Sequence, residues 1–349
     1  MKIFSILIVF ISIISCKQSV NNKLPHAENI TNSETSKDFT IVFASCNDQN
    51  RAQPLWEPIL MNAPDLFIWG GDNIYSDTDD MSKMKKDYDK LISNTYYKEL
   101  SRTIPVIGTW DDHDYGKNDA GVEWEKKKES QQLFLDFLRI PKDDSLRIQE
   151  GVYYSRKYTT PAGSLKVISL DTRYFRDPLK RSKIKGWRYD AWEEQDGMTI
   201  LGDVQWKWLE GELEDESAMF TIIISSIQFL NDEHGYEKWG NFPSEVKKMY
   251  TLLKKANAKN IMILSGDRHF AEFSSVEVEG LPYKLIDFTS SGLTHTYPDS
   301  PPSPNRYRVG KEIKDLNFGV LRFDFTHKKV VMEIRGENNL LLEELELQY

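Results

Sequence analysis

The stretch LFIWGGDNIY, residues 66–75, joins a short apolar run to a polar cluster. The residues from Leu66 to Trp69 are all apolar, which is typical of a strand buried on both faces of a sheet. Gly71 and Asp72 follow closely and indicate a turn, and Tyr75 lies three positions after the aspartate. The stretch therefore predicts a buried strand whose carboxyl end carries oxygen donors.

Five further polar clusters follow short apolar runs in the same way. They are Ser45–Asn47, Trp110–Asp114, Leu170–Arg173, Gln228 and Ser265–His269. The carboxyl ends of the strands in an open α/β sheet share one edge, so these clusters are expected to converge into a single site. Asp, His, Cys, Tyr and Asn gathered at one edge are the side chains that a hydrolase with several metal ions needs.

The rest of the chain predicts an α/β fold of two sheets with helices outside them. Apolar runs predict strands at Phe39–Ala44, Leu66–Trp69, Ile104–Gly108, Leu165–Leu170, Phe220–Ser225 and Ile261–Leu264. Amphipathic patterns predict helices at Ser130–Leu138, at Ser244–Lys255 and after a cap at Asp203. Beyond Asp267, alternating polarity predicts antiparallel strands at Ser275–Val278, Tyr283–Thr289, Gly319–Phe325 and Val330–Arg335. Two long segments, Lys180–Met198 and Asp299–Arg308, are expected to be surface loops that wall a cleft.

Composition limits the classes of partner. The 349 residues are 40% hydrophobic and 12% aromatic, which is enough to bury a large core. The net charge of −9 argues against a surface for nucleic acid or anionic membrane, although a local positive site could still hold an anionic substrate. No strong interdomain linker is visible, so residues 38–349 are expected to form one catalytic domain. No feature of the sequence indicates a protein partner.

The first residues have the pattern of an export signal. Lys2 precedes the apolar stretch Ile3 to Ile14, which is short for a membrane span but suits a signal peptide. Ser15 before Cys16 resembles a bacterial lipobox, in which the cysteine is lipidated and becomes the first residue of the mature protein. We therefore expect a signal peptide at 1–15, a flexible tether at 16–37 and a lipid anchor in the outer membrane or a periplasm-facing membrane. An ordinary signal peptide with an incidental cysteine is the alternative.

Cys46 would be the only thiol left if Cys16 is lipidated, so it could not form an intramolecular disulfide. Burial as a small hydrophobic residue is the commonest state of a free cysteine. Its position just after an expected strand, between Ser45 and Asn47, equally favours a metal ligand or a nucleophile. Position alone leaves both hypotheses open.

The motif residues offer two kinds of donor. Asp72 can bridge two ions, and a thiolate together with a phenolate from Tyr75 favours a strongly Lewis-acidic ion such as ferric iron. Asp112, Asn118 and Asp267 suit a neighbouring ion that prefers oxygen. In Gly266–His269 the Asp and His are two residues apart and point the same way if the backbone stays extended.

Each cluster also has a structural explanation. A Gly-Asp pair after a strand is often only a turn, and a lone histidine such as His234, His295 or His327 is more often structural than a ligand. Trp110–Asp114 is harder to explain in that way, because three carboxylates so close together repel one another unless cations or salt bridges compensate. The number of clusters at strand ends favours the joint metal site over any single motif.

Taken together, the series resembles the PhoD-like alkaline phosphatase and phosphodiesterase family of the metallophosphoesterase superfamily. The resemblance is carried by Ser45-Cys46, Gly71–Tyr75, Trp110–Asp114, Leu170–Pro178, Leu201-Gly202 with Gln205-Trp206, and Gly266–His269. It spans Phe39 to Arg335. The chain departs from the wider superfamily in Cys46, which replaces the first Asp-x-His motif, and in Gln228, which stands where another metal-binding His is usual.

This resemblance implies a four-layer αββα sandwich of two mixed sheets and a centre of Fe³⁺ and Ca²⁺. It implies that Cys46, Asp72, Tyr75 and His269 hold the iron, and that Asp72, Asn118 and Asp267 hold the calcium. Asp112 falls where the superfamily has the Asn of its Gly-Asn-His motif and is assigned to the metals, and His113 occupies the catalytic His position. Arg173 is the expected phosphate clamp, since a guanidinium can grip two oxygens at once. The family's extra N-terminal domain is expected to be absent.

The expected function is metal-dependent hydrolysis of phosphate esters by an activated water, at an exported, lipid-anchored enzyme. A phosphodiesterase or phospholipase D-like enzyme acting on diesters is the first alternative. A non-catalytic surface lipoprotein that binds glycans through its nine Trp is an alternative of another class. A serine hydrolase is disfavoured because no Gly-x-Ser-x-Gly motif occurs.

Overall fold

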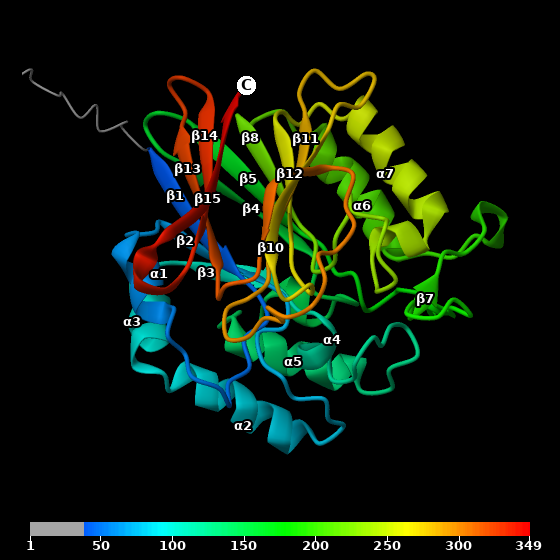
Figure 1. The fold of residues 1–349 in the computed structure, drawn as a ribbon. Coiled ribbons are helices and arrows are strands. Elements are labelled where there is room, and N and C mark those ends of the chain that lie inside the picture. Colours follow the sequence, from blue (N-terminus) through cyan, green and yellow to red (C-terminus); the bar gives the residue numbers. More distant parts are fainter. Residues whose placement is uncertain (1–37) are drawn as a thin grey trace, which may run out of the picture. The chain divides into compact units, whose positions relative to one another are not determined.

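Two mixed β-sheets lie face to face in the computed structural model, which describes residues 38–349 (Figure 1). The first sheet has the strand order β15-β14-β13-β1-β2-β3. Its strands are β1 (Phe39–Ala44), β2 (Leu66–Gly70), β3 (Val106–Thr109), β13 (Phe318–Asp324), β14 (Lys329–Arg335) and β15 (Leu341–Gln348). The pairs β1–β2 and β2–β3 are parallel, and the pairs that join β1, β13, β14 and β15 are antiparallel.

The second sheet has the order β12-β10-β11-β9-β8-β5-β4. Its strands are β4 (Tyr154–Thr159), β5 (Ser164–Ser169), β8 (Phe220–Ile224), β9 (Ile261–Ser265), β10 (Ala271–Val276), β11 (Leu285–Ser290) and β12 (Arg308–Ile313). The strands β5, β8, β9 and β11 pair in parallel, while β4, β10 and β12 pair antiparallel to their neighbours. A separate two-stranded ribbon consists of β6 (Lys180–Arg181) and β7 (Tyr189–Asp190).

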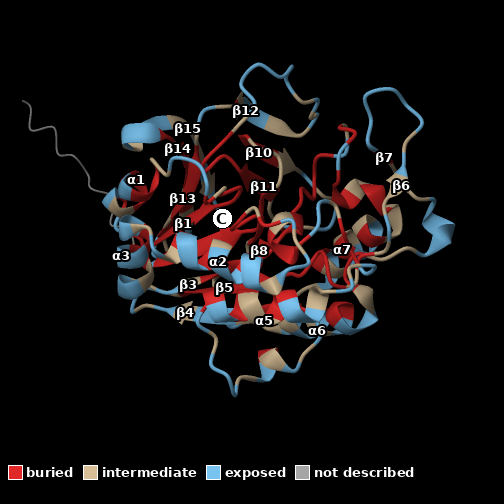
Figure 2. Cartoon of the chain, turned by 90° about the horizontal axis from the view of Figure 1, so that it is seen from below, coloured by how far each residue is buried: buried red, intermediate tan, exposed pale blue. Residues whose placement is uncertain are grey.

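Helices cover the outer faces of both sheets. The first sheet is accompanied by α1 (Trp56–Met61), α2 (Met81–Ile92), α3 (Thr95–Thr103), α4 (Asp112–Tyr115) and α5 (Lys127–Phe137), and the second by α6 (Gly202–Glu214) and α7 (Pro243–Lys255). Short 3₁₀ turns lie at Ser145–Arg147, Glu194–Asp196, Trp239–Asn241 and Glu337–Asn339. Figure 2 shows the buried strands inside and exposed helix surface around them. The four-layer αββα sandwich predicted from the sequence is confirmed.

Aromatic side chains fill the space between the sheets. Phe43 of β1 meets Phe288 of β11 edge-on with ring centroids 4.8 Å apart, and Phe220 of β8 meets Phe323 of β13 at 5.2 Å. Burying one such ring stabilises the fold by about 1.5–3 kcal/mol. These contacts fix one sheet against the other.

Several expectations need correction. The strands after Asp267 are not all antiparallel to their neighbours, because β11 runs parallel to β9 and antiparallel to β10. The segments Lys180–Met198 and Asp299–Arg308 do contribute to the wall of a cavity, as expected, but the first contains β6 and β7.

The expectations for a signal peptide at 1–15, lipidation of Cys16 and a tether at 16–37 lie outside the described residues. Within residues 38–349, none of the helices combines the length and apolar character needed to cross a bilayer.

Candidate metal centre

The carboxyl ends of strands from both sheets meet at one cavity of about 1100 Å³. Cys46 follows β1, Asp72 and Tyr75 follow β2, and Asp267 and His269 follow β9. Tyr75, Asp267 and His269 line the cavity, and Cys46 and Asp72 are buried beside them. The convergence predicted from the strand-end pattern is therefore present, and it draws donors from both sheets.

Cys46, Asp72, Tyr75 and His269 are linked by a series of close contacts. The Cys46 Sγ is 3.6 Å from Asp72 Oδ2, and the Tyr75 hydroxyl is 3.2 Å from the same oxygen. The Tyr75 hydroxyl is also 3.5 Å from His269 Nε2. Cys46 is buried and unbonded to another cysteine, but its sulfur faces polar partners rather than an apolar core. This placement favours the hypothesis of a ligand over that of a packing residue.

A second group of donors is acidic. Asp72, Asp111, Asp112 and Asp267 each offer a carboxylate oxygen within 4.8 Å of those of the others. Burial and neighbouring carboxylates raise the pKa of Asp72 well above its ordinary value, and burial together with Asp112 raises the pKa of Asp267 to about 7. So many buried carboxylates at this spacing repel one another when ionised. The group therefore has the electrostatic character of a cation site.

The three carboxylates of the cluster Trp110–Asp114 have different partners and therefore different roles. Asp114 accepts the backbone N–H of Asp111 at 2.7 Å and that of Asn73 at 3.4 Å, so it holds the turn. Asp111 pairs with Arg173. Asp112 lines the cavity and accepts the N–H of Asp119 at 2.6 Å. Burial opposes ionisation of Asp112, but the charges of His113 and Arg173 outweigh it and hold its pKa below the ordinary value.

The backbone at the candidate ligands is unusual. Cys46, Asp72, Asp267 and His269 all have left-handed φ, at +60°, +52°, +66° and +56°. Non-glycine residues rarely adopt this region, and such strain persists where the surrounding structure enforces it, most often at functional sites. Gly71, with φ of +99°, allows the close approach beside them, because a Cβ there would lie 2.7 Å from Asp111 Cβ.

His113 lines the cavity and is held in place from two sides. Its Nδ1 lies 2.6 Å from Asp77 Oδ2, and its ring stacks on Tyr75 with centroids 4.1 Å apart. Burial favours the neutral ring, but the charges of Asp112, Asp72 and Asp77 outweigh it and raise the pKa of His113 to about 11. Because Nδ1 is engaged by Asp77, Nε2 remains as the nitrogen that can serve a substrate.

Arg173 is not placed as a phosphate clamp, and this expectation is corrected. Its side chain is fully buried, outside the lining of the cavity. The guanidinium pairs with Asp111 and lies 2.6 Å from Glu237 Oε2, and Glu237 in turn binds Arg176 Nε at 2.9 Å. These carboxylates occupy the donors that a phosphate would need. Arg173 instead neutralises and positions Asp111.

The remaining predicted residue, Asn118, lines the cavity and is exposed. Gln228, noted for its position after a strand, is buried and donates to Glu272 and Thr289 at 2.8 Å each. His234 and His295 line the cavity, whereas His327 is exposed and pairs with Asp324. The ring centroids of His295 and His269 lie 4.4 Å apart, a proximity that no motif around His295 predicts.

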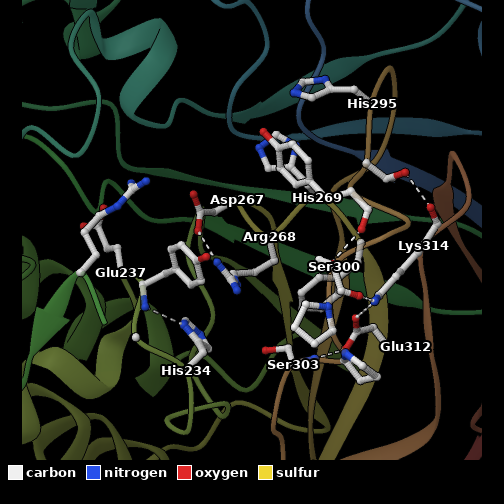
Figure 3. A pocket seen from close by; sticks show the side chains of 18 of the residues that line it. His234, Glu237, Asp267, Arg268, His269, His295, Ser300, Ser303, Glu312 and Lys314 are labelled. Atoms are coloured by element: carbon white, nitrogen blue, oxygen red, sulfur yellow. Dashed lines mark hydrogen bonds and ion pairs between the residues drawn. The ribbon is translucent and has the colours of Figure 1, made fainter. Parts of the chain in front are cut away.

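Sequence reasoning also gave no role to Glu237 or Arg268. Glu237 joins the buried pairs described above, and Arg268 lines the cavity between Asp267 and His269 (Figure 3). The neighbouring motif Gly266–His269 could have drawn attention to Arg268. Glu237 lies outside every motif and carried no such signal.

Comparisons with known proteins agree with this architecture. A family described as PhoD-like phosphatase matches residues 41–305. Alkaline phosphatase D of Bacillus subtilis strain 168 is 24% identical over 207 residues, covering 54% of this chain and 35% of the relative. The chain thus spans about a third of the length of that curated relative.

Two solved structures share the fold. A structure of PhoD superimposes with a TM-score of 0.68 at 16% identity, covering 89% of this chain and 68% of the other. A dimetal phosphatase from Danio rerio superimposes with a TM-score of 0.56 at 14% identity, covering 90% of this chain and 99% of the other.

Proposed function

The chain belongs to the PhoD-like phosphatase family, and from this premise we propose that it hydrolyses phosphate esters with the help of bound metal ions. One observation carries the proposal. Phenol, imidazole and carboxylate donors line a cavity of about 1100 Å³, large enough to admit a substrate, and the Cys46 thiol and the Asp72 carboxylate lie buried beside them.

The donors fit cations of two kinds. Burial and the charges of Asp72 and Asp267 raise the pKa of the Cys46 thiol, so a nearby cation is needed to keep it as a thiolate. Burial and His295 lower the pKa of His269 to about 3, which leaves the ring neutral, as a ligand must be. We propose Fe³⁺ beside Cys46, Asp72, Tyr75 and His269.

Ca²⁺ suits the oxygen donors Asp72, Asp112, Asn118 and Asp267. Cations held by these residues would neutralise charge on the phosphate and lower the pKa of the attacking water.

The chain's own residues supply the remaining chemistry. Despite burial, the charges of Asp112, Asp72 and Asp77 raise the pKa of His113 and favour its protonated form, and Asp77 holds Nδ1, so Nε2 can donate a proton to the departing alkoxide oxygen. The attacking oxygen comes from water, so no covalent bond to the protein is required. Asp111, one of the four carboxylates of the acidic group, is held in place by its ion pair with Arg173.

Purified protein tests the proposal directly. It should contain iron and calcium, absorb visible light through thiolate or phenolate charge transfer, and hydrolyse a nitrophenyl phosphate. Strong chelation or Asp72→Ala should abolish the hydrolysis. Protein that retains both metals but hydrolyses neither a nitrophenyl monoester nor a bis-nitrophenyl diester would refute the proposal.

The ratio of those two activities separates a monoesterase from an enzyme that prefers diesters, including phospholipid head groups. The glycan-binding alternative has less support. Trp187 is the one exposed Trp of the nine, all of which lie in the described part of the chain, and Trp56, Trp69, Trp110 and Trp239 are fully buried. Such rings pack the core and are not available to a sugar.

We further propose that the protein is an exported bacterial lipoprotein anchored through Cys16. The support is the apolar stretch Ile3 to Ile14 followed by Ser15 and Cys16. Labelling of growing cells with a fatty-acid analogue should mark the wild type and not Cys16→Ser, and the variant should leave the membrane fraction. A membrane-bound Cys16→Ser protein would contradict the anchor.

A further inference from the structure

Three consecutive side chains after β9 line the same cavity: Asp267, Arg268 and His269 (Figure 3). In an extended strand neighbouring side chains point to opposite faces, so Arg268 would lie away from its neighbours. The backbone is not extended here, because Asp267 and His269 are left-handed and the N–H of Arg268 donates to Gly266 O at 2.9 Å. This bend brings the guanidinium to the ligand side and corrects the extended geometry expected from the sequence.

The guanidinium of Arg268 is held in place by rings and lacks acceptors. Its central carbon lies 4.5 Å from the Tyr236 ring centroid and 5.5 Å from that of Phe270, and the side chain is only 9% exposed. Nε is buried and has no hydrogen-bond acceptor among residues 38–349. The carboxylate of Asp267 lies 3.9 Å from Nη1, which is too long for a hydrogen bond. A buried guanidinium normally has its N–H groups paired, so an acceptor is missing.

The other cations of the cavity wall are already paired. Arg51 lies 3.1 Å from Asp48, Arg188 2.8 Å from Asp119, and Lys314 3.4 Å from Glu312. Arg268 differs from them because its guanidinium N–H groups have no hydrogen-bond acceptor among residues 38–349. It also lies next to Asp267 of the acidic group. A ligand that supplies the acceptors missing at Arg268 must offer oxygen atoms, and negative charge on those oxygens strengthens the hydrogen bonds.

We infer that Arg268 binds the phosphoryl oxygens of the substrate, in the role that the sequence had suggested for Arg173; this inference rests on the proposed function. A guanidinium can donate two parallel hydrogen bonds to a phosphate, and the rings of Tyr236 and Phe270 fix its plane for that purpose. A phosphate bound there would lie beside Asp267, one of the residues proposed to hold a cation. Arg268 is thus a substrate-binding residue that would add positive charge beside the proposed cation site.

The test compares Arg268→Met and Arg268→Lys with the wild type, all loaded with metal. Equilibrium dialysis measures the affinity for inorganic phosphate, and steady-state kinetics measures kcat/KM for a nitrophenyl phosphate. Loss of a charge-assisted hydrogen-bond pair is expected to weaken phosphate binding about tenfold or more and to lower kcat/KM about 10- to 100-fold in Arg268→Met. Arg268→Lys keeps the charge but loses the fork, so its loss should be smaller.

Elemental analysis of iron and calcium in each variant distinguishes a loss of phosphate binding from a loss of metal. Arg156→Met is the matched control, because Arg156 is exposed on β4 and does not line the cavity. This variant should have the phosphate affinity and the kcat/KM of the wild type. Phosphate affinity of Arg268→Met within about twofold of the wild type, at full metal content, would overturn the inference. If Arg268→Met loses its metals, Arg268→Lys decides. A loss of phosphate affinity of more than about twofold at full metal content supports the inference, and an affinity within about twofold of the wild type overturns it.

The outcomes also separate this inference from the proposed function. Phosphate binding that depends on Arg268 in a protein that hydrolyses no ester would refute the function and keep the inference. Hydrolysis that is unchanged in Arg268→Met would refute the inference and keep the function.

Discussion

Replacing Arg173 by Met should destabilise the fold more than it weakens substrate binding. Arg173 is fully buried between Asp111 and Glu237, and Arg176 also lies 2.9 Å from Glu237, so Glu237 is expected to keep one partner when Arg173 is lost. The uncompensated charge is therefore mainly that of Asp111. Breaking a buried ion pair by removing one partner costs about 3–5 kcal/mol.

The size of the thermal shift follows from the size of the chain. Unfolding entropy is about 2.1 cal/mol/K per residue, or about 0.7 kcal/mol/K for a domain of this size, so 3–5 kcal/mol lowers Tm by about 4–7 °C. Differential scanning calorimetry of the metal-loaded wild type and Arg173→Met measures the shift directly. Ion concentrations must be equal in both samples, because ligands that bind only the folded state raise Tm.

Arg268→Met serves as the contrasting variant. Among residues 38–349 its guanidinium makes no hydrogen bond and packs against the rings of Tyr236 and Phe270, which a Met side chain can also contact, so Tm should stay near that of the wild type. A Tm for Arg173→Met within about 1 °C of the wild type, together with a raised KM, would refute the structural role of Arg173 and restore it as a phosphate clamp.

Three further outcomes are expected. Tyr75→Phe removes the phenol that lies 3.2 Å from Asp72 and 3.5 Å from His269, so the protein should lose phenolate absorption and retain less iron on dialysis; unchanged absorption would place the phenol outside the ligand set. Chelation should lower Tm, because the four carboxylates within 4.8 Å then repel one another without a cation, and a Tm that does not respond to chelation would contradict a metal site. In chelated protein, burial raises the pKa of Asp287 to about 6, above its value in the unfolded chain, so this group's contribution to stability should fall as pH rises from about 4 to about 6, by roughly 2–3 kcal/mol. Denaturant titrations should find that part of the pH dependence missing in Asp287→Asn, and an unchanged profile would exclude Asp287 as its source.

The strands that the sequence predicted well share a physical cause. Runs such as Phe39–Ala44 and Phe220–Ile224 are buried on both faces, so almost every residue had to be apolar. Helix α2 was missed because only Met84, Tyr88 and Leu91 are buried in an otherwise charged segment. The edge strand β15 was missed because most of its residues are exposed or half-buried, so its apolar pattern is weak.

The sequence predicted most of the residues that meet at the site, but less of how their side chains are placed. The rule that strand ends share an edge was enough to bring Cys46, Asp72 and His269 together. It could not distinguish Arg173 from Arg268, since both stand beside an acidic motif after a strand. Arg268 reaches the cavity because its neighbours Asp267 and His269 have left-handed backbone, and Arg173 is paired in part by Glu237, which lies far away in the sequence. Local sequence patterns predict neither feature.

The donors come from two sheets that touch through aromatic packing, with Cys46 and Asp72 on one side and Asp267 and His269 on the other. A small shift of one sheet relative to the other would therefore change the distances between these donors, and with them the size of the ion that fits. If the proposed ions bind here, packing residues such as Phe43 and Phe288, which do not line the cavity, would help to determine which ion fits, and a change in their size would alter that preference with every proposed ligand unchanged.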